Sequence, residues 1–443
     1  MAQLDLLTLQ NAVKTAAAFR CRTRLQPAGG EGDKVFPPTY AGSVYAMERR
    51  RIPGRDELVR CVLLDSVQSQ ANRAEEALQD AVDDERIAIP VVEVDFSDIP
   101  VVDPGSDEDG LFEPIGRVSS LEAPHRIADA ILRDSELNGT AFRSSDEGRK
   151  IIMATLRNAT PLFEICPTAL VYGIWDSTGP KGGLGVKFQR AVVSEIIGVD
   201  AALGVKTSSR MDPLAIRSDA TIYHRDNSDG GLDWTSNASD EDIVKDKSGK
   251  PVLYNRSGSS TGKPGNPSKA NHSNIPPTLS DMKADPLGDG NVYLAGGVTI
   301  QYAEQTTVLS LPALRRLRFP LGSDSKTDAE TNLAAQAVLA AIGLCGAALA
   351  AERGLDLRSR CLLWPAETSS WELLGKPGEE PEKFDLTADD AVKLLNDAVE
   401  AAQAKGLPWR SERLVLKPAR KLVELVRKSQ ELAVKSGGDE GGE

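Results

Sequence analysis

Apolar and polar residues alternate near the N-terminus and predict a half-buried β-strand. In AFRCRTRLQP (18–27), one face carries Phe19, Cys21, Thr23 and Leu25, and the other carries Arg20, Arg22, Arg24 and Gln26. A period of two is typical of a strand with one buried face. Three neighbouring arginines repel one another unless an anion lies across them. Their face is therefore a candidate track for single-stranded nucleic acid, and the alternative is a solvated sheet face.

Spacings of three and four residues predict amphipathic helices at both ends of the chain. In 62–82 the apolar side carries Val67, Ala71, Ala74, Leu78 and Val82. Gln68 and Asn72 lie one helical turn apart on the opposite side, where they form either an ordinary polar face or a binding face. Near the C-terminus, helices are expected at 387–406 and 419–434 with a strand at 413–418 between them, and Thr387 with Asp390 resembles a capping box.

The segment LAAQAVLAAIGLCGAALAA (333–351) is long enough to cross a bilayer. It is mostly alanine, which supplies little hydrophobic drive, and it contains Gln336, Gly343 and Gly346. We therefore expect a buried helix over 328–353 whose small residues allow close packing. A transmembrane span is the alternative.

A glycine-rich loop lies in YGIWDSTGPKGGLGVKFQRAVVSEIIG (172–198). The pattern predicts a strand over 168–175, a loop around Lys181, and a helix over 186–198 that carries Lys187 and Arg190. A glycine loop before a helix can cradle phosphate. Neither G-x-x-x-x-G-K-[ST] nor G-x-G-x-x-G occurs here, so the loop matches no common nucleotide-binding motif, and a plain flexible turn is the alternative.

The chain is expected to combine strand–helix–strand units with antiparallel hairpins, which is an α+β fold. From Arg210 to about Gly290 it is rich in Ser, Asn, Asp, Gly and Pro, which predicts a protruding insertion. A β-hairpin is expected over 291–311. The predicted divisions are a first unit made of 16–210 and 291–365, a loop-rich insertion over 211–290, and a C-terminal helical extension with an acidic tail over 366–443.

The composition limits the functions that the chain can have. Its 443 residues carry a net charge of −13, which argues against bulk binding of nucleic acid or anionic lipid but leaves room for a local basic groove. Five cysteines form no C-x-x-C pair, and the three histidines are far apart in sequence, so neither a zinc site nor a cofactor is expected. No signal peptide is recognised, which predicts a cytoplasmic location.

Catalytic motifs such as G-x-S-x-G and H-E-x-x-H are absent from the sequence. Asp176, beside the glycine loop, and Asp212, in SRMDPL, are the carboxylates with the best position for chemistry, although capping of their loops is the simpler interpretation. The basic segments RRLR (315–318) and LRSR (357–360) are expected on strand-like stretches, where they either are solvated or join a common groove.

An ordered set of short motifs resembles a known family. It comprises RCRTRLQPAG, FPPTYAGSVY, LLDSVQSQANRAEE, PTALVYGIWDSTGPKGG, SRMDPL, GGVTI, LSLPALRRLRF and LRSRCLL, in this order. From about residue 18 to about residue 365, the chain is similar to the RAMP-type backbone subunit of type I-U (also called I-G) CRISPR surveillance complexes, or Cascade.

The resemblance implies a ferredoxin-like, RRM-like palm with finger and thumb insertions. It implies that copies of the chain stack as a helical filament along one CRISPR RNA (crRNA), beside other Cascade subunits, and reach target DNA through the guide. It implies RNA binding without catalysis. The residues that would contact the guide RNA are Arg20, Arg22, Arg24, Gln68, Asn72, Arg73, Lys181, Lys187, Arg190, Arg315, Arg316, Arg318, Arg358 and Arg360.

Two other functions stay open at this point. The first is a metal-dependent RAMP endoribonuclease that acts on guide or target RNA, for which Asp176 or Asp212 would be the candidate residues. The second is a small-molecule enzyme that binds phosphate through the glycine loop.

Overall fold

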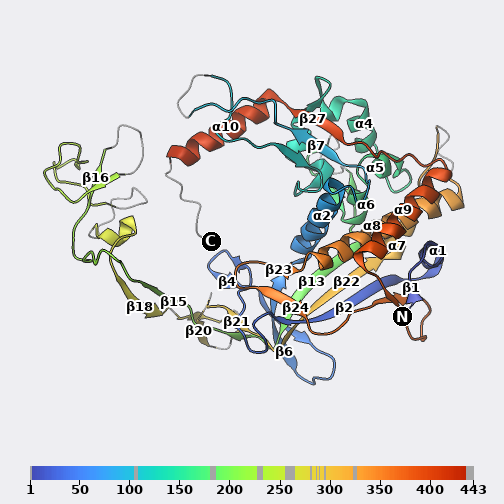
Figure 1. Cartoon of the computed structure of the whole chain (residues 1–443), viewed down its shortest axis with the longest axis horizontal. Helices are drawn as coiled ribbons and strands as arrows, with labels where there is room; N and C mark the ends of the chain where they lie inside the picture. Colours follow the sequence, from blue (N-terminus) through green and yellow to red (C-terminus); the bar gives the residue numbers. More distant parts are fainter. Residues whose placement is uncertain are drawn as a thin grey trace.

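The computed structural model describes residues 2–103, 108–179, 186–226, 233–254, 265–279, 282–285, 287–288, 290–293, 296–322 and 327–435. These residues form a mixed α+β protein, as the sequence predicts. Figure 1 shows a curled main sheet with helices packed on it, and an arm that extends away from the sheet.

The main sheet has ten strands, and most of its neighbours are antiparallel. Along its principal path the strands are β1 (Ala2–Gln3), β26 (Glu382–Asp385), β25 (Trp371–Leu374), β2 (Ala18–Pro27), β22 (Tyr302–Ser310), β13 (Val192–Val199), β6 (Leu58–Asp65) and β5 (Met47–Arg51). Two short strands, β23 (Leu355–Asp356) and β24 (Leu362–Pro365), join the sheet at β2. The predicted strand at 18–27 is confirmed as β2, with Phe19 and Leu25 fully buried.

Two helices cover one face of this sheet. Helix α2 (Val67–Asp83) packs against β13, and α8 (Ala329–Glu352) packs against β22 and α2. In chain order the central elements are β2, α2, β13, β22, α8 and β25. In the sheet their strands lie in the order β25, β2, β22, β13, and each neighbouring pair is antiparallel. The opposite face carries the arginines of β2.

Helix α8 confirms the buried alanine-rich helix expected over 328–353. Among the described residues it is the one helix that is long and apolar enough to cross a membrane, and 83% of its most apolar window is buried within the fold. A Cβ atom on Gly346 would collide with the Tyr172 hydroxyl, and one on Gly343 would lie 2.7 Å from Val192 Cγ2. The glycines therefore allow the helix to approach its neighbours closely.

The C-terminal part of the chain is built into the two larger sheets. Strands β25 and β26 extend the main sheet, and α9 (Ala388–Ala404) packs on α8 behind the expected capping box of Thr387 and Asp390. Strand β27 (Leu414–Pro418) joins a five-stranded sheet beside β7 (Val92–Asp95), β8 (Arg117–Ser119), β9 (Ser135–Leu137) and β10 (Thr140–Ala141). Helix α10 (Arg420–Lys435) follows. In Figure 1, α2 lies between β7 of this sheet and β13 of the main sheet.

Ion pairs attach this C-terminal segment to the five-stranded sheet. Lys417 contacts Asp95 at 3.2 Å, and Lys421 contacts Asp134 at 2.6 Å. Hydrogen bonds from Ser97 and Lys417 lower the pKa of Asp95 to about 2, and those from Arg133 and Lys421 lower the pKa of Asp134 to about 2.

The segment is therefore expected to loosen in acid. A carboxyl group whose pKa is lowered by folding contributes stability above its ordinary pKa of 3.8 and loses it as the pH falls toward 2. Hydrogen exchange, corrected for its intrinsic pH dependence, should show protection in β27 and α10 falling over this window before protection in β22 does. Asp134→Asn should loosen the segment already at neutral pH. Equal loss of protection in all three elements would contradict this expectation.

Three sequence-based element predictions between residues 62 and 198 are wrong in their bounds or in their type. The helix expected over 62–82 begins only at Val67, because residues 58–65 form β6. The strand expected over 168–175 is mostly helix α6 (Thr168–Val171), followed by the short strand β11 (Ile174–Trp175). The helix expected over 186–198 is instead β12 (Lys187–Phe188) and β13, whose β-branched run pairs with β22 and β6.

The arm rises from the pair formed by β14 (Ala202–Leu203) and β21 (Val298–Thr299). Its stalk is β15 (Thr207–Arg210) with β18 (Ile275–Leu279), and its tip contains β16 (Tyr223–Arg225) and β17 (Asp233–Thr235). Strands β19 (Met282–Ala284) and β20 (Asn291–Tyr293) pair at its base. The hairpin expected over 291–311 is wrong, since β20, β21 and β22 pair with other strands.

The remaining elements are short. They are α1 (Leu6–Thr15), α3 (Ala130–Arg133), α4 (Asp146–Ile152), α5 (Thr160–Ile165), α7 (Leu311–Arg315), β3 (Thr39–Tyr40), β4 (Val44–Tyr45) and the 3₁₀ turns Arg126–Ala128, Phe142–Ser144 and Pro267–Ala270. The predicted division into a palm, an insertion and a C-terminal extension stays a prediction.

Candidate nucleic-acid interface

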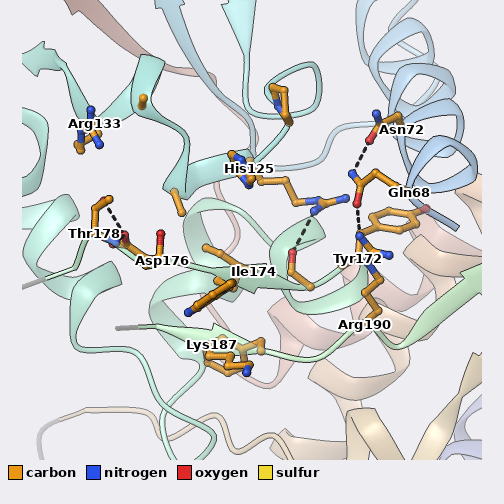
Figure 2. Close-up of a pocket in the computed structure, with 18 residues that line it drawn as sticks. Gln68, Asn72, His125, Arg133, Tyr172, Ile174, Asp176, Thr178, Lys187 and Arg190 are labelled. Carbon is orange, nitrogen blue, oxygen red and sulfur yellow. Dashed lines mark hydrogen bonds between the residues drawn. The ribbon is translucent and has the colours of Figure 1, made fainter. Parts of the chain in front are cut away.

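A large cavity lies at the N-terminal half of α2. It has a volume of about 780 Å³, and its described wall comes from α2, from residues 124–133, and from residues 172–178 and 187–190. Figure 2 shows the side chains that line it. The cavity brings together four of the residues predicted to contact RNA, namely Gln68, Asn72, Lys187 and Arg190.

A series of hydrogen bonds runs along the wall of this cavity. Ser66 caps α2 by accepting a hydrogen bond from the Ser69 amide at 3.2 Å. This start places Gln68 and Asn72 one turn apart on one side of the helix. Arg190 donates to the Gln68 side-chain oxygen, and the Gln68 amide group donates to Asn72 Oδ1 at 3.1 Å. The series starts at the Arg190 guanidinium and ends at Asn72, which lines the cavity and whose amide N–H groups have no acceptor among the described residues.

Lys187 and Arg190 supply positive charge that no described carboxylate pairs. Arg190 also donates to the Tyr172 carbonyl at 3.2 Å, and burial together with the charge of Arg126 lowers its pKa. Lys187 Nζ lies 5.6 Å from the centroid of the Trp175 ring, and its side chain is exposed. A partly buried guanidinium near a second arginine is stabilised by an added anion.

The other charged groups of the wall are already paired. Arg126 forms a two-pronged ion pair with Glu75, with both distances 2.5 Å, and Arg133 contacts Asp134 at 2.7 Å. The remaining carboxylate of the wall, Asp176, is held by Arg143 outside the cavity at 2.7 Å. Lys187 and Arg190 therefore leave the described wall with a net positive charge, which suits an anionic ligand.

The sequence-based reasoning missed four residues of this region: Glu75, His125, Arg126 and Trp175. Arg126 is 4% exposed and has a φ angle of 53°, so it is held in a left-handed conformation beneath the cavity. Glu75 lies 51 positions before Arg126, and no local pattern links the two. His125 lines the wall (Figure 2). An isolated tryptophan beside a glycine loop was the one signal that could have been used.

The glycine loop joins two strands of a hairpin rather than a strand and a helix. Strands β11 and β12 pair Ile174 with Phe188 and Trp175 with Lys187. Lys181 lies outside the described residues, so its predicted contact with phosphate stays a prediction. Thr178 and Lys187, on either side of the loop, both line the cavity.

The arginine face of β2 forms a second, separate groove of about 490 Å³ on the open side of the main sheet. Arg20 contacts Glu372 at 2.7 Å, and Arg22 contacts Glu304 at 2.8 Å. The protein thus supplies carboxylates for two of the three arginines. Arg24 is exposed and lies 4.3 Å from the centroid of the Tyr302 ring, with no carboxylate partner among the described residues. Arg24 is the arginine of this strand that is best placed to bind an external anion.

Arg73 and Arg358 converge on one buried carboxylate. Asp65 is fully buried, and it accepts hydrogen bonds from Gln70 at 2.6 Å, Arg73 at 3.0 Å and Arg358 at 3.2 Å. Arg73 also donates to the Leu357 carbonyl at 2.7 Å. These contacts tie α2 to residues 356–358, which accounts for both arginines without RNA.

The remaining predicted arginines also have partners in the fold. Arg315 donates to the carbonyls of Val13 and Ala16 at the end of α1, and Arg318 donates to the carbonyls of Arg315 and Leu317. Arg316 donates to Gln189 at 3.1 Å, beside Arg190, and Arg360 lies 4.9 Å from the centroid of the Phe36 ring. The RRLR segment lies at the end of helix α7, not on a strand as expected.

The two carboxylates considered for catalysis cap their own loops. Asp176 accepts from Arg143 and from the Thr178 amide at 3.0 Å. Asp212 accepts from the amides of Leu214 and Ser273, and these bonds lower its pKa. In the part of the chain that the structure describes, no group of three or more His, Cys, Asp or Glu side chains could hold a metal ion.

The described residues form a mixed α+β protein with a cavity whose wall carries two cations that no described carboxylate pairs. Residues 19–203 match the model of a family described as CRISPR-associated protein GSU0053 (Cas_GSU0053). This match to a CRISPR-associated family supports a role in a CRISPR system. The matched segment is less than half of the chain, and it contains the four predicted residues of the cavity. No curated protein matches the chain.

Proposed function

We propose that this protein is a RAMP-type backbone subunit of a type I-U (I-G) CRISPR effector complex, which binds guide RNA along its sugar-phosphate chain. The observation that carries the proposal is the cavity in which Gln68, Asn72, Lys187 and Arg190 converge. Its two cations, which no described carboxylate pairs, suit phosphate, and its amide groups suit phosphate or ribose oxygens. The match of this same region to a CRISPR-associated family supplies the biological context.

The strand order supports a ferredoxin-like, RRM-like palm. Two βαβ halves, with the strand order β25, β2, β22, β13 and both helices on one face, are the arrangement expected of that fold. In this proposal β5 and β6 are additions at one edge of the sheet, and the arm is one of the inserted elements.

Recognition of the RNA backbone rather than the bases follows from the proposed function. A guide-binding subunit must accept any spacer sequence, so it should contact phosphate and ribose and leave the pairing edges of most bases open. Lys187, Arg190 and Arg24 carry their charge on long side chains that fit this need. We propose that the subunit is not itself an enzyme.

Copies of the chain would stack along the RNA beside other Cascade subunits and reach target DNA only through the guide. The exposed side chains of the arm favour such contacts. Met211 is 89% exposed and Leu214 is 73% exposed, and both lie at the join between stalk and tip. Exposed apolar residues at such a join are suited to pack against a neighbouring copy.

Expression of the full chain with a CRISPR array tests the proposal. We expect a large particle that contains RNA of defined length, and we expect purified protein to bind single-stranded RNA of unrelated sequences with similar affinities. The logarithm of the binding constant should fall linearly with the logarithm of salt concentration, because phosphate contacts release counterions. Purification free of RNA, together with no binding of any RNA at low salt, would contradict the proposal.

A further inference from the structure

An exposed tryptophan faces the cationic cavity from the β11–β12 hairpin. Trp175 is 58% exposed, whereas its neighbours Ile174 and Asp176 are only 6% and 7% exposed. It lines the cavity together with Lys187 and Arg190. An indole that remains exposed in a concave wall offers a flat apolar face to a ligand.

The hairpin holds this ring in place. Trp175 pairs directly with Lys187 in the strand register, so both side chains lie on the same face. The Asp176 amide donates to the Val186 carbonyl at 2.9 Å, and the Asp176 carboxylate is fixed by Arg143 and Thr178. On the other face Ile174 and Phe188 are buried. The ring therefore lies on a hairpin that is fixed by the contacts of Asp176 and by the buried side chains of Ile174 and Phe188.

The ligand that fits these features has a flat aromatic part and a negative charge. A ligand that stacks on the indole must have a π-face, and a ligand that binds Lys187 and Arg190 must carry negative charge. A nucleotide unit meets both requirements, and a cavity of about 780 Å³ is within the usual range for small-molecule sites. A bare phosphate would leave the indole uncovered.

We propose that Trp175 is a stacking platform for one nucleobase of the bound RNA, while Lys187 and Arg190 hold an adjacent phosphate. This inference rests on the proposed RNA-binding function and refines it. It assigns the cavity to one nucleotide of the bound RNA. Stacking is tolerant of sequence because every base has a π-face.

The test compares two probes: a short single-stranded RNA, and a ribose-phosphate chain of the same length without bases. The full-length protein is used as wild type, Trp175→Leu, Trp175→Phe and Lys187→Gln. We expect Trp175→Leu to weaken binding of the RNA about tenfold and binding of the abasic chain hardly at all. Trp175→Phe should retain most of the affinity, because phenylalanine still stacks. Lys187→Gln should weaken binding of both probes equally.

Trp364→Leu is the matched control. Trp364 is 64% exposed on β24 and does not line the cavity, so its replacement should leave the difference between the two probes unchanged. Equal thermal midpoints across the variants show that each one folds. If wild type binds both probes equally, or Trp175→Leu weakens both equally, the stacking platform is wrong while RNA binding stands. If no variant binds either probe, the proposed function itself is wrong.

Discussion

Replacing Glu75 with alanine is expected to lower the free energy of unfolding by about 3–5 kcal/mol. Glu75 is 2% exposed and Arg126 is 4% exposed, and each is the other's charge partner beneath the cavity. Among the described residues, alanine would leave the buried guanidinium with the Gly173 carbonyl as its one remaining acceptor. Burial raises the pKa of Glu75 to about 7, although Arg126 opposes the shift. Denaturant unfolding should therefore be measured at a pH about one unit above this pKa, where the Glu75 carboxylate is mostly ionised.

Two variants control this prediction. Glu76→Ala removes the next residue along α2, whose side chain is 54% exposed and lies 3.7 Å from Arg353, and it should cost less than about 1 kcal/mol. Glu75→Leu combined with Arg126→Met removes both charges and should recover most of the loss, because no unpaired charge remains buried. A double variant as unstable as Glu75→Ala would show that packing, rather than the lost charge partner, causes the effect.

The double variant Lys187→Ala/Arg190→Ala is expected to bind single-stranded RNA at least about tenfold more weakly at low salt. The two cations are the ones in the described cavity wall that lack a carboxylate partner. Removing two phosphate contacts should also reduce the slope of log K against log salt by about 1.4, at roughly 0.7 per contact for single strands. Fluorescence anisotropy over a salt series measures both quantities.

A matched pair of exposed cations provides the comparison. Lys376 is 79% exposed in a loop and Arg420 is 82% exposed on α10, and neither lines the cavity. Their double alanine variant has the same change in net charge and should leave both affinity and slope nearly unchanged. A loss confined to one RNA sequence, or an unaltered salt slope in the cavity variant, would rule out backbone recognition at this site.

The parts of the fold that the sequence predicted correctly are those with strong local patterns. The alternation in 18–27, the alanine run of 328–353 and the capping box at Thr387 each depend on neighbours in sequence, and β2, α8 and α9 confirm them. Two of the wrong assignments lie around the glycine loop. There the short apolar run 192–199 fits a helix or a strand equally well, and pairing with β22 and β6 decided the outcome.

The candidate site was predicted only in part, because local patterns identify some of its residues and tertiary contacts decide the rest. Gln68 and Asn72 could be identified from helical spacing, and Lys187 and Arg190 from their place after the loop. The partners that tie up Arg73 and Arg358 could not be foreseen, because Asp65 approaches them only through the tertiary fold. Likewise, the carboxylates beside Arg20 and Arg22 come from strands about 350 and 280 positions away.

The arm leaves the main sheet through a narrow base. Where β14 meets β21, the backbones of Gly204 and Gly297 are joined by a hydrogen bond of 2.8 Å, and side chains at Gly204 or Gly296 would collide with the opposite segment. The tip has a small core of its own, built around Ile222, Ile243 and Tyr254. Because Gly204 and Gly297 are neighbours in space, a tight turn between them could span the same gap as the arm without moving β14 or β21. A change in the length of the arm should therefore leave the flanking strands in place, whereas its deletion would also remove Asp285, the buried partner of Arg60 on β6 at 2.8 Å.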